Sequence, residues 1–485
     1  MSEIVISKIE KNNEFLTIYD PCCGGGNLLF GVEDRIKEIS DRPIATYGQD
    51  WSDSLYALSK IESRFRENSQ IEYGNTLTST KFYDKEFDVV FTNPPQGISW
   101  KDFSKDIYND KTGQYHFYPS KSDGQLLFNQ HIISRVNHTG FAVVVHNGSA
   151  LFSGDAGSGE SNIRKWLFDN DYVEAIIQLP TDEFFNTNIT TYIWVLNKNK
   201  SNERKKKVIL IDASKKFKLL KKNKGKKRKE IDKKSREDLL KTLLEFKDNE
   251  YARVFGREYF YFDKQSIILT NIDTEGRSFE KSLNGKKSLK LNTDKVIQKS
   301  EDGEIVIDEF SIKEFDKEKF DSLKSYNDEI KSKLSNLNYK EGLKVETNGT
   351  FYYFDNEKET LVKEINGDKE KLGCGKIIIK SSYKKATKSK PEKIIISVEL
   401  IPDYEKDYEI IPYSEDPEEN KRNIEKFMKK YISKPFTYGD NVVGVEINFN
   451  KIFYKPEKLR DLNVIIEEIK QHDKELKQLE EDLGL

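Results

Sequence analysis

The sequence has few of the residues that build crosslinked or metal-stabilised proteins. Its 485 residues include three cysteines and five histidines. These are too few for a disulfide framework or a cysteine-rich zinc site, and no two histidines have the spacing of a ligand pair. No apolar run approaches the roughly 18–20 residues that span a membrane, and the first residues lack the apolar core of a signal peptide. We therefore expect a soluble, cytoplasmic protein without a structural metal.

Charge and aromatic content exclude two further classes of protein. Lys and Arg (81) nearly balance Asp and Glu (83), which gives a net charge of −2. A uniformly basic coat for nucleic acid is thereby excluded, whereas a local basic patch is not. The 29 Phe, 24 Tyr and 4 Trp residues provide ample material for a core, which excludes wholesale disorder. A chain of this length is expected to form two or three domains.

Short β-rich runs recur through the first 200 residues, with helical or loop stretches between them. Seven such runs with intervening helices predict a doubly wound, Rossmann-like α/β sheet. The last two runs are joined by a loop too short for a helical crossover, so we expect them to be antiparallel. This mixed topology suits a methyltransferase better than a dinucleotide-binding fold. The runs are residues 15–19, 45–48, 71–73, 87–92, 140–146, 173–179 and 190–196.

The sequence divides into three regions. Residues 1–207 form the α/β domain, and residues 208–400 are expected to be a basic, charged and largely helical extension. This extension contains a lysine-rich run, Ser214–Arg236, whose composition fits phosphate contacts and a solvated surface loop equally well. Residues 401–485 form a C-terminal region that ends in a helix predicted over Pro456–Leu485.

Apolar residues of this terminal helix recur at spacings of three, four or seven and make one seam between charged faces. Such a seam suits an intramolecular helix pair or docking on the coiled coil of a partner. The seam residues are Leu462, Ile466, Ile469, Leu476 and Leu483.

A glycine turn follows the first predicted strand. It reads Asp20-Pro-Cys-Cys-Gly24-Gly25-Gly26-Asn27 and leads into an amphipathic helix. Glycines let the backbone approach a nucleotide-like ligand, and the helix N-terminus offers free N–H groups. A plain strand–turn–helix link with permissive glycines is the alternative.

Two polar residues follow the next two strands. Asp50 lies 24 residues beyond Gly26, where a carboxylate can bind the hydroxyls of a ribose; it is otherwise a solvated acid or a helix N-cap. Asn75 follows the third strand, where its amide could hydrogen-bond an adenine edge, although it also suits an ordinary turn.

The most specific motif is Asn93-Pro94-Pro95, directly after the fourth strand. The side-chain oxygen of Asn93 and the carbonyl of Pro94 can both accept N–H bonds from an exocyclic amine, and the prolines fix these acceptors in place. A rigid turn would be the simpler interpretation if the motif stood alone. Beside a cofactor loop, the motif predicts methyl transfer to such an amine.

These motifs resemble those of the modification (methyltransferase) subunit of type I restriction–modification systems. The resemblance extends to residues 140–152, 162–167, 179–189, 211–214 and 443–449. It implies a seven-stranded S-adenosylmethionine-dependent adenine-N6 DNA methyltransferase domain followed by a helix-rich C-terminal region. It also implies three partners: double-stranded DNA, a DNA-specificity subunit that packs on the C-terminal helices, and a restriction subunit.

The resemblance assigns roles to individual residues. A target adenine would be flipped from the duplex, and its N6 would be held by Asn93 and Pro94 for direct attack on the cofactor methyl group. Asp50 would bind the cofactor ribose, and Asn75, where the family usually has Asp, its adenine. The implied catalytic residues are Asn93, Pro94, Pro95 and Gln96, and the implied cofactor-binding residues are Asp20, Gly24, Gly25, Gly26, Asn27, Asp50 and Asn75.

The sequence departs from the family in two places. Gln96 stands where the family has Phe or Tyr, whose ring stacks on the flipped base; a lost stack costs about 1–3 kcal/mol. Only 18 residues precede Tyr19, so the family's helical N-terminal domain is either lost or supplied by a separate polypeptide. Both departures favour an alternative function, a catalytically silent or split remnant that keeps the fold and the specificity-subunit interface. A nicotinamide dehydrogenase would instead require a fuller glycine fingerprint and no Asn-Pro-Pro.

Overall fold

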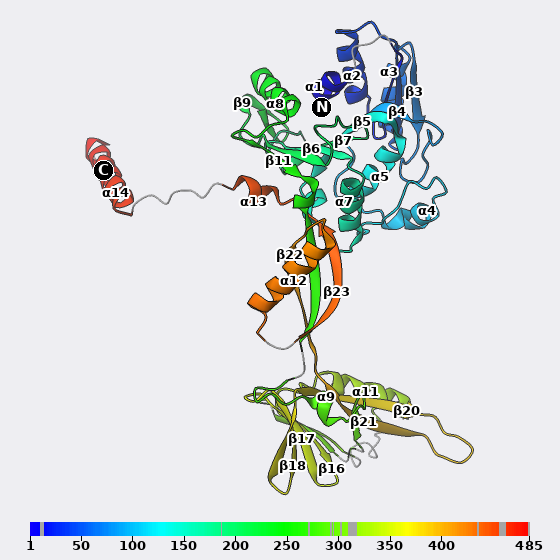
Figure 1. The fold of residues 1–485 in the computed structure, drawn as a ribbon, viewed down its shortest axis with the longest axis vertical. Coiled ribbons are helices and arrows are strands. Elements are labelled where there is room, and N and C mark those ends of the chain that lie inside the picture. Colours follow the sequence, from blue (N-terminus) through cyan, green and yellow to red (C-terminus); the bar gives the residue numbers. More distant parts are fainter. Residues whose placement is uncertain are drawn as a thin grey trace. The chain divides into compact units, whose positions relative to one another are not determined.

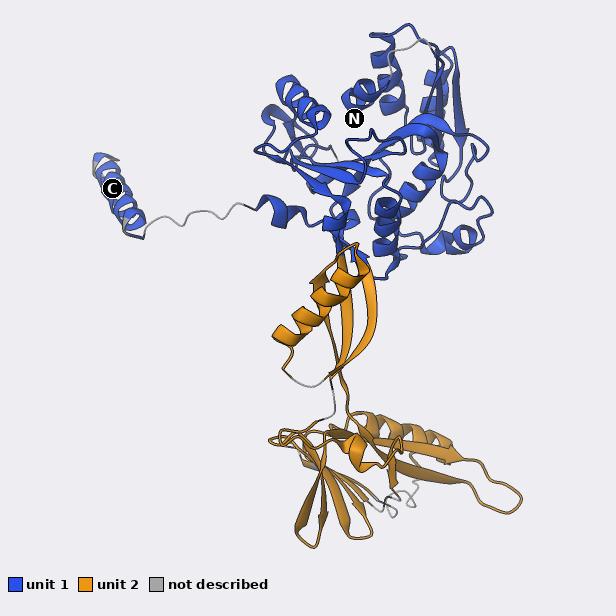
Figure 2. Cartoon of the chain, in the orientation of Figure 1, with its two compact units in different colours: residues 1–261, 444–485 blue, residues 262–443 orange. Residues whose placement is uncertain are grey.

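The computed structural model describes residues 1–9, 14–185, 187–269, 272–291, 293, 295–300, 303–308, 318–433, 436–454 and 462–483. The chain forms two compact units, shown in different colours in Figure 2. Unit 1 comprises residues 1–261 and 444–485, and unit 2 comprises residues 262–443. No described helix is long and apolar enough to cross a lipid bilayer.

Unit 1 is built around one large mixed sheet (Figure 1), with strand order β11-β8-β6-β7-β5-β4-β1-β2-β3. Each of the seven predicted runs overlaps a strand of this sheet. Strands β8 and β11 extend it, so it has nine strands rather than the expected seven. Strand β7 is antiparallel to β6, as predicted, and it is also antiparallel to β5. The strands are β1 Leu16–Asp20, β2 Ile44–Asp50, β3 Ser69–Tyr73, β4 Phe87–Thr92, β5 Val136–Asn147, β6 Val173–Gln178, β7 Thr191–Asn197, β8 Lys207–Asp212 and β11 Ala252–Gly256.

The central strands read as continuous apolar runs because helices cover both faces of the sheet. In β5, Val143 and Val145 point to one face and Val144 to the other, and all three are buried. One face packs against α1, α2 and α8, and the other against α5, which also contacts α7. The helices of unit 1 are α1 Ser2–Lys8, α2 Asn27–Lys37, α3 Asp53–Ser63, α4 Ser104–Tyr108, α5 Gln125–Arg135, α6 Ser149–Phe152, α7 Gly159–Asp169, α8 Lys233–Glu245, α13 Phe449–Phe453 and α14 Leu462–Leu483, with short 3-10 turns η1 Lys101–Phe103 and η2 Arg257–Phe260.

Residues 444–449 belong to unit 1, and two side chains of α7 bind the backbone of Val445 there. The buried Arg164 of α7 donates from Nε to the carbonyl oxygen of Val445 at 2.7 Å. The Val445 N–H donates to the Ser161 hydroxyl at 3.1 Å. Residues 444–449 of the stretch that resembles the family near the C-terminus are therefore an integral part of unit 1.

The terminal helix α14 is confirmed over residues 462–483, whereas residues 455–461 and 484–485 of the predicted segment lie outside the described residues. The seam residues Leu462, Ile466, Ile469 and Leu476 are exposed. The side chain of Leu483 is not among those described, nor is Asn186 of the resembling stretch 179–189.

The expectation of a largely helical extension over residues 208–400 is wrong. The described part of this range is mainly strands, and the terminal helix α14 lies beyond it. Lys and Glu are abundant there and favour helices, but stretches such as Thr350–Asp355 and Lys393–Pro402 are rich in β-branched and aromatic residues that favour strands. The charged side chains alternate onto the solvent faces of these sheets.

The described residues of unit 2 form three separate sheets. The first, β22-β12-β23, packs against α12 around Ile267, Ile411, Ile424 and Met428. A three-stranded sheet, β13-β21-β20, and a six-stranded sheet, β15-β14-β16-β17-β18-β19, contribute to a second core together with α9 and α11. The elements are β12 Tyr261–Leu269, β13 Leu289–Leu291, β14 Lys295–Ser300, β15 Gly303–Asp308, β16 Leu343–Thr347, β17 Thr350–Asp355, β18 Thr360–Ile365, β19 Asp368–Gly373, β20 Gly375–Lys384, β21 Lys393–Pro402, β22 Glu405–Pro412, β23 Phe436–Val445, α9 Phe279–Ser282, α11 Leu323–Ser335 and α12 Pro417–Tyr431.

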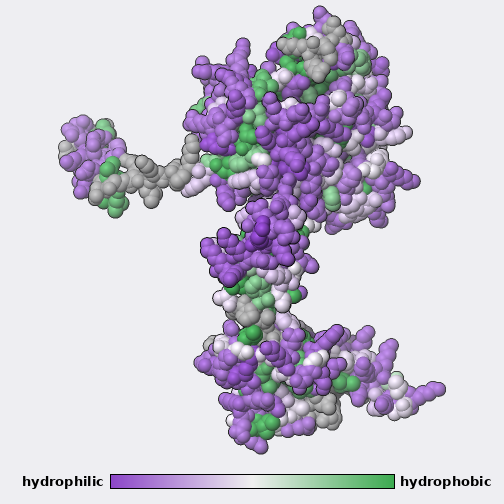
Figure 3. All heavy atoms as spheres, viewed as in Figure 1, coloured by the Kyte–Doolittle hydropathy of each residue, from purple (hydrophilic) through white to green (hydrophobic). Residues whose placement is uncertain are grey.

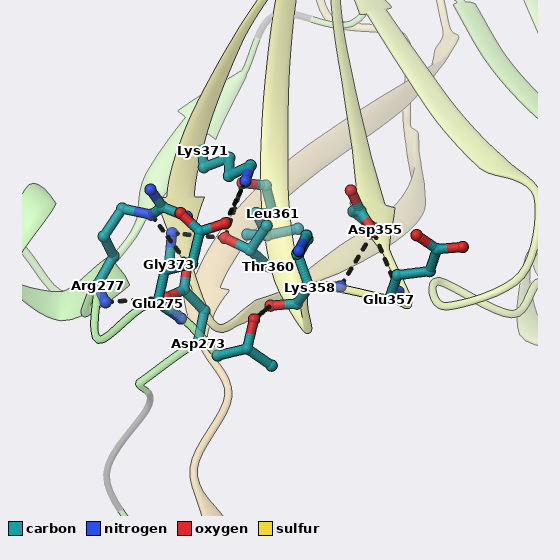
Figure 4. Close-up of polar contacts among 11 residues, drawn as sticks. Asp273, Glu275, Arg277, Asp355, Glu357, Lys358, Thr360, Leu361, Lys371 and Gly373 are labelled. Carbon is teal, nitrogen blue, oxygen red and sulfur yellow. Dashed lines mark hydrogen bonds and ion pairs between the residues drawn. The ribbon is translucent and has the colours of Figure 1, made fainter.

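A polar cluster fixes the 273–277 turn to the β18–β19 hairpin within unit 2 (Figure 4). The carboxylate of Asp273 accepts from the Arg277 backbone N–H at 2.9 Å and from its Nε at 3.0 Å. Glu275 then pairs with Arg277 and with Lys371 of β19. These contacts are local, and we assign them a structural role.

Candidate active site

The glycine turn lies at the carboxyl end of β1. Gly24 and Gly26 have φ values of +54° and +86°, in the left-handed region that favours glycine. A Cβ on Gly26 would lie 2.4 Å from the Phe30 ring, so this position also needs glycine for packing against α2. A Cβ on Gly24 would have no heavy atom within 4 Å, so the space beside this part of the turn is open.

Asp50, at the end of β2, is tied directly to this turn. Its Oδ2 accepts from the Gly24 N–H at 2.9 Å, and its Oδ1 accepts from the Ser52 N–H at 2.9 Å. Each carboxylate oxygen retains a further lone pair for a ligand. The carboxylate is therefore fixed beside the glycine turn and can still accept hydrogen bonds from hydroxyl groups.

Asn75 follows β3 and is held by its own turn. Its Oδ1 accepts from the Leu77 N–H at 3.0 Å, which directs the amide Nδ2 away from this contact. Because Nδ2 is a donor, this side chain can offer a hydrogen bond where the family's usual aspartate can only accept one.

Asn93 follows the last residue of β4, and its side chain is exposed. Among the described residues it has no hydrogen-bond partner. Pro94 is buried, Pro95 is exposed and Gln96 is half-buried. The two prolines restrict the backbone at this point, so the Asn93 amide is presented from a constrained turn.

One cavity brings the separate motifs together. Its volume is about 310 Å³, within the range of small-ligand sites. Gly24, Asp50, Asn75, Asn93 and Pro95 line it. The parallel pairing of β4, β1, β2 and β3 explains this convergence, because the carboxyl ends of these strands meet at one edge of the sheet. The predicted site residues that do not line the cavity are Asp20, Gly25, Gly26, Asn27, Pro94 and Gln96.

Aromatic side chains that the sequence did not single out complete the cavity wall. Trp51, Trp100, Phe103 and Phe128 all line it. Trp100 is buried and donates from Nε1 to the Ser120 carbonyl at 2.8 Å, and Trp51 meets Phe103 edge to face at 6.0 Å. Trp51 could have been found from its place directly after Asp50, whereas the other rings come from segments that only the tertiary structure brings near. Such rings can stack on a planar base.

Asp20 lies beneath the glycine turn, and its pKa is raised. It is almost fully buried and accepts from the Cys22 N–H at 3.0 Å. Burial, together with the nearby Asp50 carboxylate, raises the pKa of Asp20 to about 7. The side chain therefore changes charge near neutral pH, directly under the turn.

This raised pKa predicts a pH-dependent effect of Asp20→Asn on stability. An acid whose pKa is higher in the folded state contributes stability fully only below its unfolded pKa, near 4, and loses it as pH rises through 7. The variant lacks this ionisation and keeps the acceptor for the Cys22 N–H. We expect the free energy of unfolding of the variant, relative to wild type, to increase by about 1 kcal/mol between pH 6 and pH 8.

All four tryptophans lie within residues 1–261, so urea unfolding followed by tryptophan fluorescence reports on unit 1 and measures this difference. A constant difference between the two proteins at pH 6 and pH 8 would show that Asp20 does not titrate in this range.

The two buried histidines are not bases for the site. Burial lowers the pKa of His131 and of His146 to about 3. His146 contacts the Asn129 Oδ1 at 2.6 Å, and His131 contacts the Gln114 Oε1 at 2.9 Å. Both side chains are neutral at physiological pH and are held in hydrogen bonds of the core.

The chain is similar to the methylase subunits of type I restriction enzymes. The MjaVII methylase subunit of a type I restriction enzyme from Methanocaldococcus jannaschii is 29% identical over 221 residues, which cover 43% of this chain and 37% of that protein. The MpnII methylase subunit from Mycoplasma pneumoniae is 31% identical over 230 residues, 44% of this chain and 41% of that protein. The chain thus matches less than half the length of these curated relatives.

Among solved structures, the methyltransferase subunit of a type I restriction–modification system from Streptococcus thermophilus superposes with a TM-score of 0.46 at 24% identity. The superposition covers 53% of this chain and 54% of that one. The family model described as N-6 DNA Methylase matches residues 1–260, more than half of the 485 residues. The chain belongs to the N-6 DNA methylase family.

Proposed function

We propose that the chain is the DNA adenine-N6 methyltransferase subunit of a type I restriction–modification complex. The observation that carries this proposal is the single cavity shared by Asp50 and Gly24 on one side and by Asn93 and Pro95 on the other. A cofactor site and an amine-binding site must share one cavity if a methyl group is to pass directly between their ligands.

The residues of the cavity suit S-adenosylmethionine. Asp50 can accept hydrogen bonds from the two ribose hydroxyls, and the open space beside Gly24 allows close approach of the ligand to the backbone. Asn75 can donate to a ring nitrogen of the adenine, and the rings of Trp51 and Phe103 offer an apolar wall. S-adenosylmethionine supplies an electrophilic methyl group, so no metal ion is required for the transfer.

The Asn-Pro-Pro motif positions the accepting amine. In this proposal the target adenine leaves the duplex, and its exocyclic N–H groups donate to the Asn93 side-chain oxygen and to the Pro94 carbonyl. These two acceptors orient the nitrogen lone pair towards the cofactor and stabilise the positive charge that grows on N6. After transfer, the surplus proton leaves N6 to solvent.

Methylation of cellular DNA tests this function. The full chain is expressed together with its specificity subunit in a host that lacks adenine methylation, and N6-methyladenine is mapped by single-molecule sequencing. We expect methylation at one recurrent sequence, because recognition would reside in the specificity subunit. Methylation of cytosine, or adenine methylation in a host that carries the specificity subunit alone, would contradict the proposal.

We further propose that the exposed seam of α14 docks on the specificity subunit and that the assembled complex includes a restriction subunit. The seam residues Leu462, Ile469 and Leu476 are exposed, and an apolar stripe of this kind suits coiled-coil packing. Deletion of residues 462–483 is expected to abolish co-purification with the specificity subunit. A chain without residues 462–483 that still co-purifies in equal amount would exclude this role for the helix.

A catalytically silent or split subunit is the second candidate, and Gln96 is the observation that favours it. An amide at this position cannot supply the stacking of an aromatic ring, and Gln96 does not line the cavity. In a split enzyme, a separate polypeptide that resembles the family's N-terminal domain would act together with this chain.

Gln96→Tyr separates this candidate from an active enzyme with a weakened base site. A restored stack of about 1–3 kcal/mol should raise the rate of adenine methylation about 5- to 150-fold. Gln96→Leu, which adds no aromatic face, is the matched control. Absence of activity in both the wild type and Gln96→Tyr would support the silent subunit. Equal gains of activity in Gln96→Tyr and Gln96→Leu would exclude stacking as the cause.

A further inference from the structure

The lysine-rich run forms an exposed hairpin of its own. Strand β9 (Lys218–Lys224) and strand β10 (Lys227–Glu230) pair only with each other. In Figure 3 the surface at the place of β9 in Figure 1 is hydrophilic. A two-stranded sheet is marginally stable in water, so contacts with the rest of unit 1 must hold it in place.

Those contacts come from the loop after β6. The N–H groups of Lys226 and Arg228 donate to the carbonyls of Phe185 and Asp182, both at 2.9 Å. At the tip, a Cβ on Gly225 would lie 2.7 Å from the Phe185 oxygen. The hairpin is therefore seated closely on residues 182–185, and its tip has a defined position.

The basic side chains of the hairpin fall into two groups. Lys227 and Lys229 point inward, where Lys227 pairs with Glu183 at 3.0 Å and Lys229 donates to the Thr181 hydroxyl at 2.9 Å. The second group consists of cations that are exposed and have no ion-pair partner among the described residues: Lys221, Lys222, Lys224, Lys226 and Arg228.

The exposed cations of the hairpin repel one another. Lys221, Lys222, Lys224 and Lys226 lie within one six-residue stretch, and none of them has an ion-pair partner among the described residues. A polyanion bound along the hairpin would remove this repulsion. Exposed lysine side chains are typical contacts of phosphate groups, which position a nucleic acid without reading its sequence.

The hairpin is seated at the same end of the strands as the candidate active site. Strands β4, β5 and β6 run in the same direction, so the loop after β6 and Asn93 after β4 both follow the carboxyl ends of their strands. The order β6-β7-β5-β4 puts three strand spacings between them, about 15 Å at ~4.8 Å per spacing. This distance corresponds to about four nucleotides of one DNA strand at ~3.4 Å each.

We propose that the β9–β10 hairpin binds the DNA phosphate backbone within several nucleotides of the adenine presented to Asn93. This inference rests on the proposed function, because it takes DNA as the substrate. The hairpin holds the duplex without reading its sequence, and it thereby fixes the target strand while the adenine is out of the helix.

The salt dependence of DNA binding tests this role. The full chain and the variant Lys221→Gln/Lys222→Gln/Lys224→Gln/Lys226→Gln are titrated against a fluorescent 30-base-pair duplex at KCl concentrations from 50 to 300 mM. Each lost phosphate contact lowers the slope of log K against log salt by about 0.9. We expect the slope to fall by about two to four and the affinity at low salt to fall at least tenfold.

A matched control removes four lysines elsewhere. Lys384, Lys385, Lys388 and Lys390 are exposed in the β20–β21 hairpin of unit 2, and their replacement with glutamine changes the net charge equally. We expect this control to bind DNA as wild type does. Equal losses in both variants would overturn the proposal, because they would show an effect of total charge.

Two further outcomes would also overturn it. An unchanged salt slope in the β9–β10 variant would remove the hairpin from the DNA-binding surface. Binding of the wild-type chain to vesicles with anionic lipids but not to the duplex, lost only in that variant, would make the hairpin a membrane contact. Calorimetric binding of S-adenosylmethionine by both variants distinguishes these failures from a failure of the proposed function.

Discussion

Replacement of Asn93 with alanine is expected to reduce adenine methylation at least about 100-fold while leaving cofactor binding nearly unchanged. The side chain is exposed at the end of β4, and among the described residues it has no hydrogen-bond partner. Its removal should therefore disturb neither the fold nor the Asp50 side of the cavity. It deletes one of two acceptors that orient the amine, and a lost acceptor or donor of this kind costs about 10²–10³ in rate.

The measurement is transfer of radiolabelled methyl groups to DNA by the complex with its specificity subunit, with Asn109→Ala as a control. Asn109 is an exposed asparagine that does not line the cavity, and its variant should retain wild-type activity. A fully active Asn93→Ala complex would refute the assignment of the Asn-Pro-Pro motif.

Replacement of Asp50 with alanine has the largest expected effect on the cofactor. Two hydrogen bonds from ribose hydroxyls to a carboxylate are worth about 1.5–3 kcal/mol each. The variant also loses the bond from the Gly24 N–H at 2.9 Å, which loosens the glycine turn. We expect the affinity for S-adenosylmethionine to fall at least about 100-fold.

Asp53→Ala provides the matched control for calorimetry. Asp53 is an exposed acid in the first turn of α3 and does not line the cavity, so its removal changes the charge equally without touching the proposed ribose site. Equal affinity of wild type and Asp50→Ala would place the cofactor elsewhere in the molecule.

The sheet and the polar side of the cavity could be predicted from the sequence because both follow from parallel topology. Strands such as β4 and β5 are buried on both faces and therefore read as unbroken apolar runs. Once they are parallel, residues directly after their carboxyl ends must meet, which explains why Asp50, Asn75 and Asn93 line one cavity.

The aromatic wall could not be predicted, because its rings come from segments with no regular pattern. Trp100 precedes a short 3-10 turn and is buried against the Ser120 carbonyl, a contact that depends on how the whole 96–124 segment folds back. Phe128 lies on α5, where nearly every residue is buried, so its position on the helix gave no sign of a ligand.

The strands of unit 2 could not be predicted, because charged residues interrupt the alternation of apolar and polar side chains that marks a strand. Strand β12, Tyr261–Leu269, alternates buried and half-buried residues along its whole length. Charged and polar residues occupy several of these positions, among them the buried Asp263 and Gln265, so the hydrophobic pattern of the strand was incomplete.

The most direct test of the account is a calorimetric titration of the full chain with S-adenosylmethionine, S-adenosylhomocysteine and NAD. The account predicts one-to-one binding of both sulfur compounds, no binding of NAD, and loss of both interactions in Asp50→Ala. Failure of the wild-type chain to bind S-adenosylmethionine, or equal binding of NAD, would contradict the assignment of the cavity as a methyl-donor site.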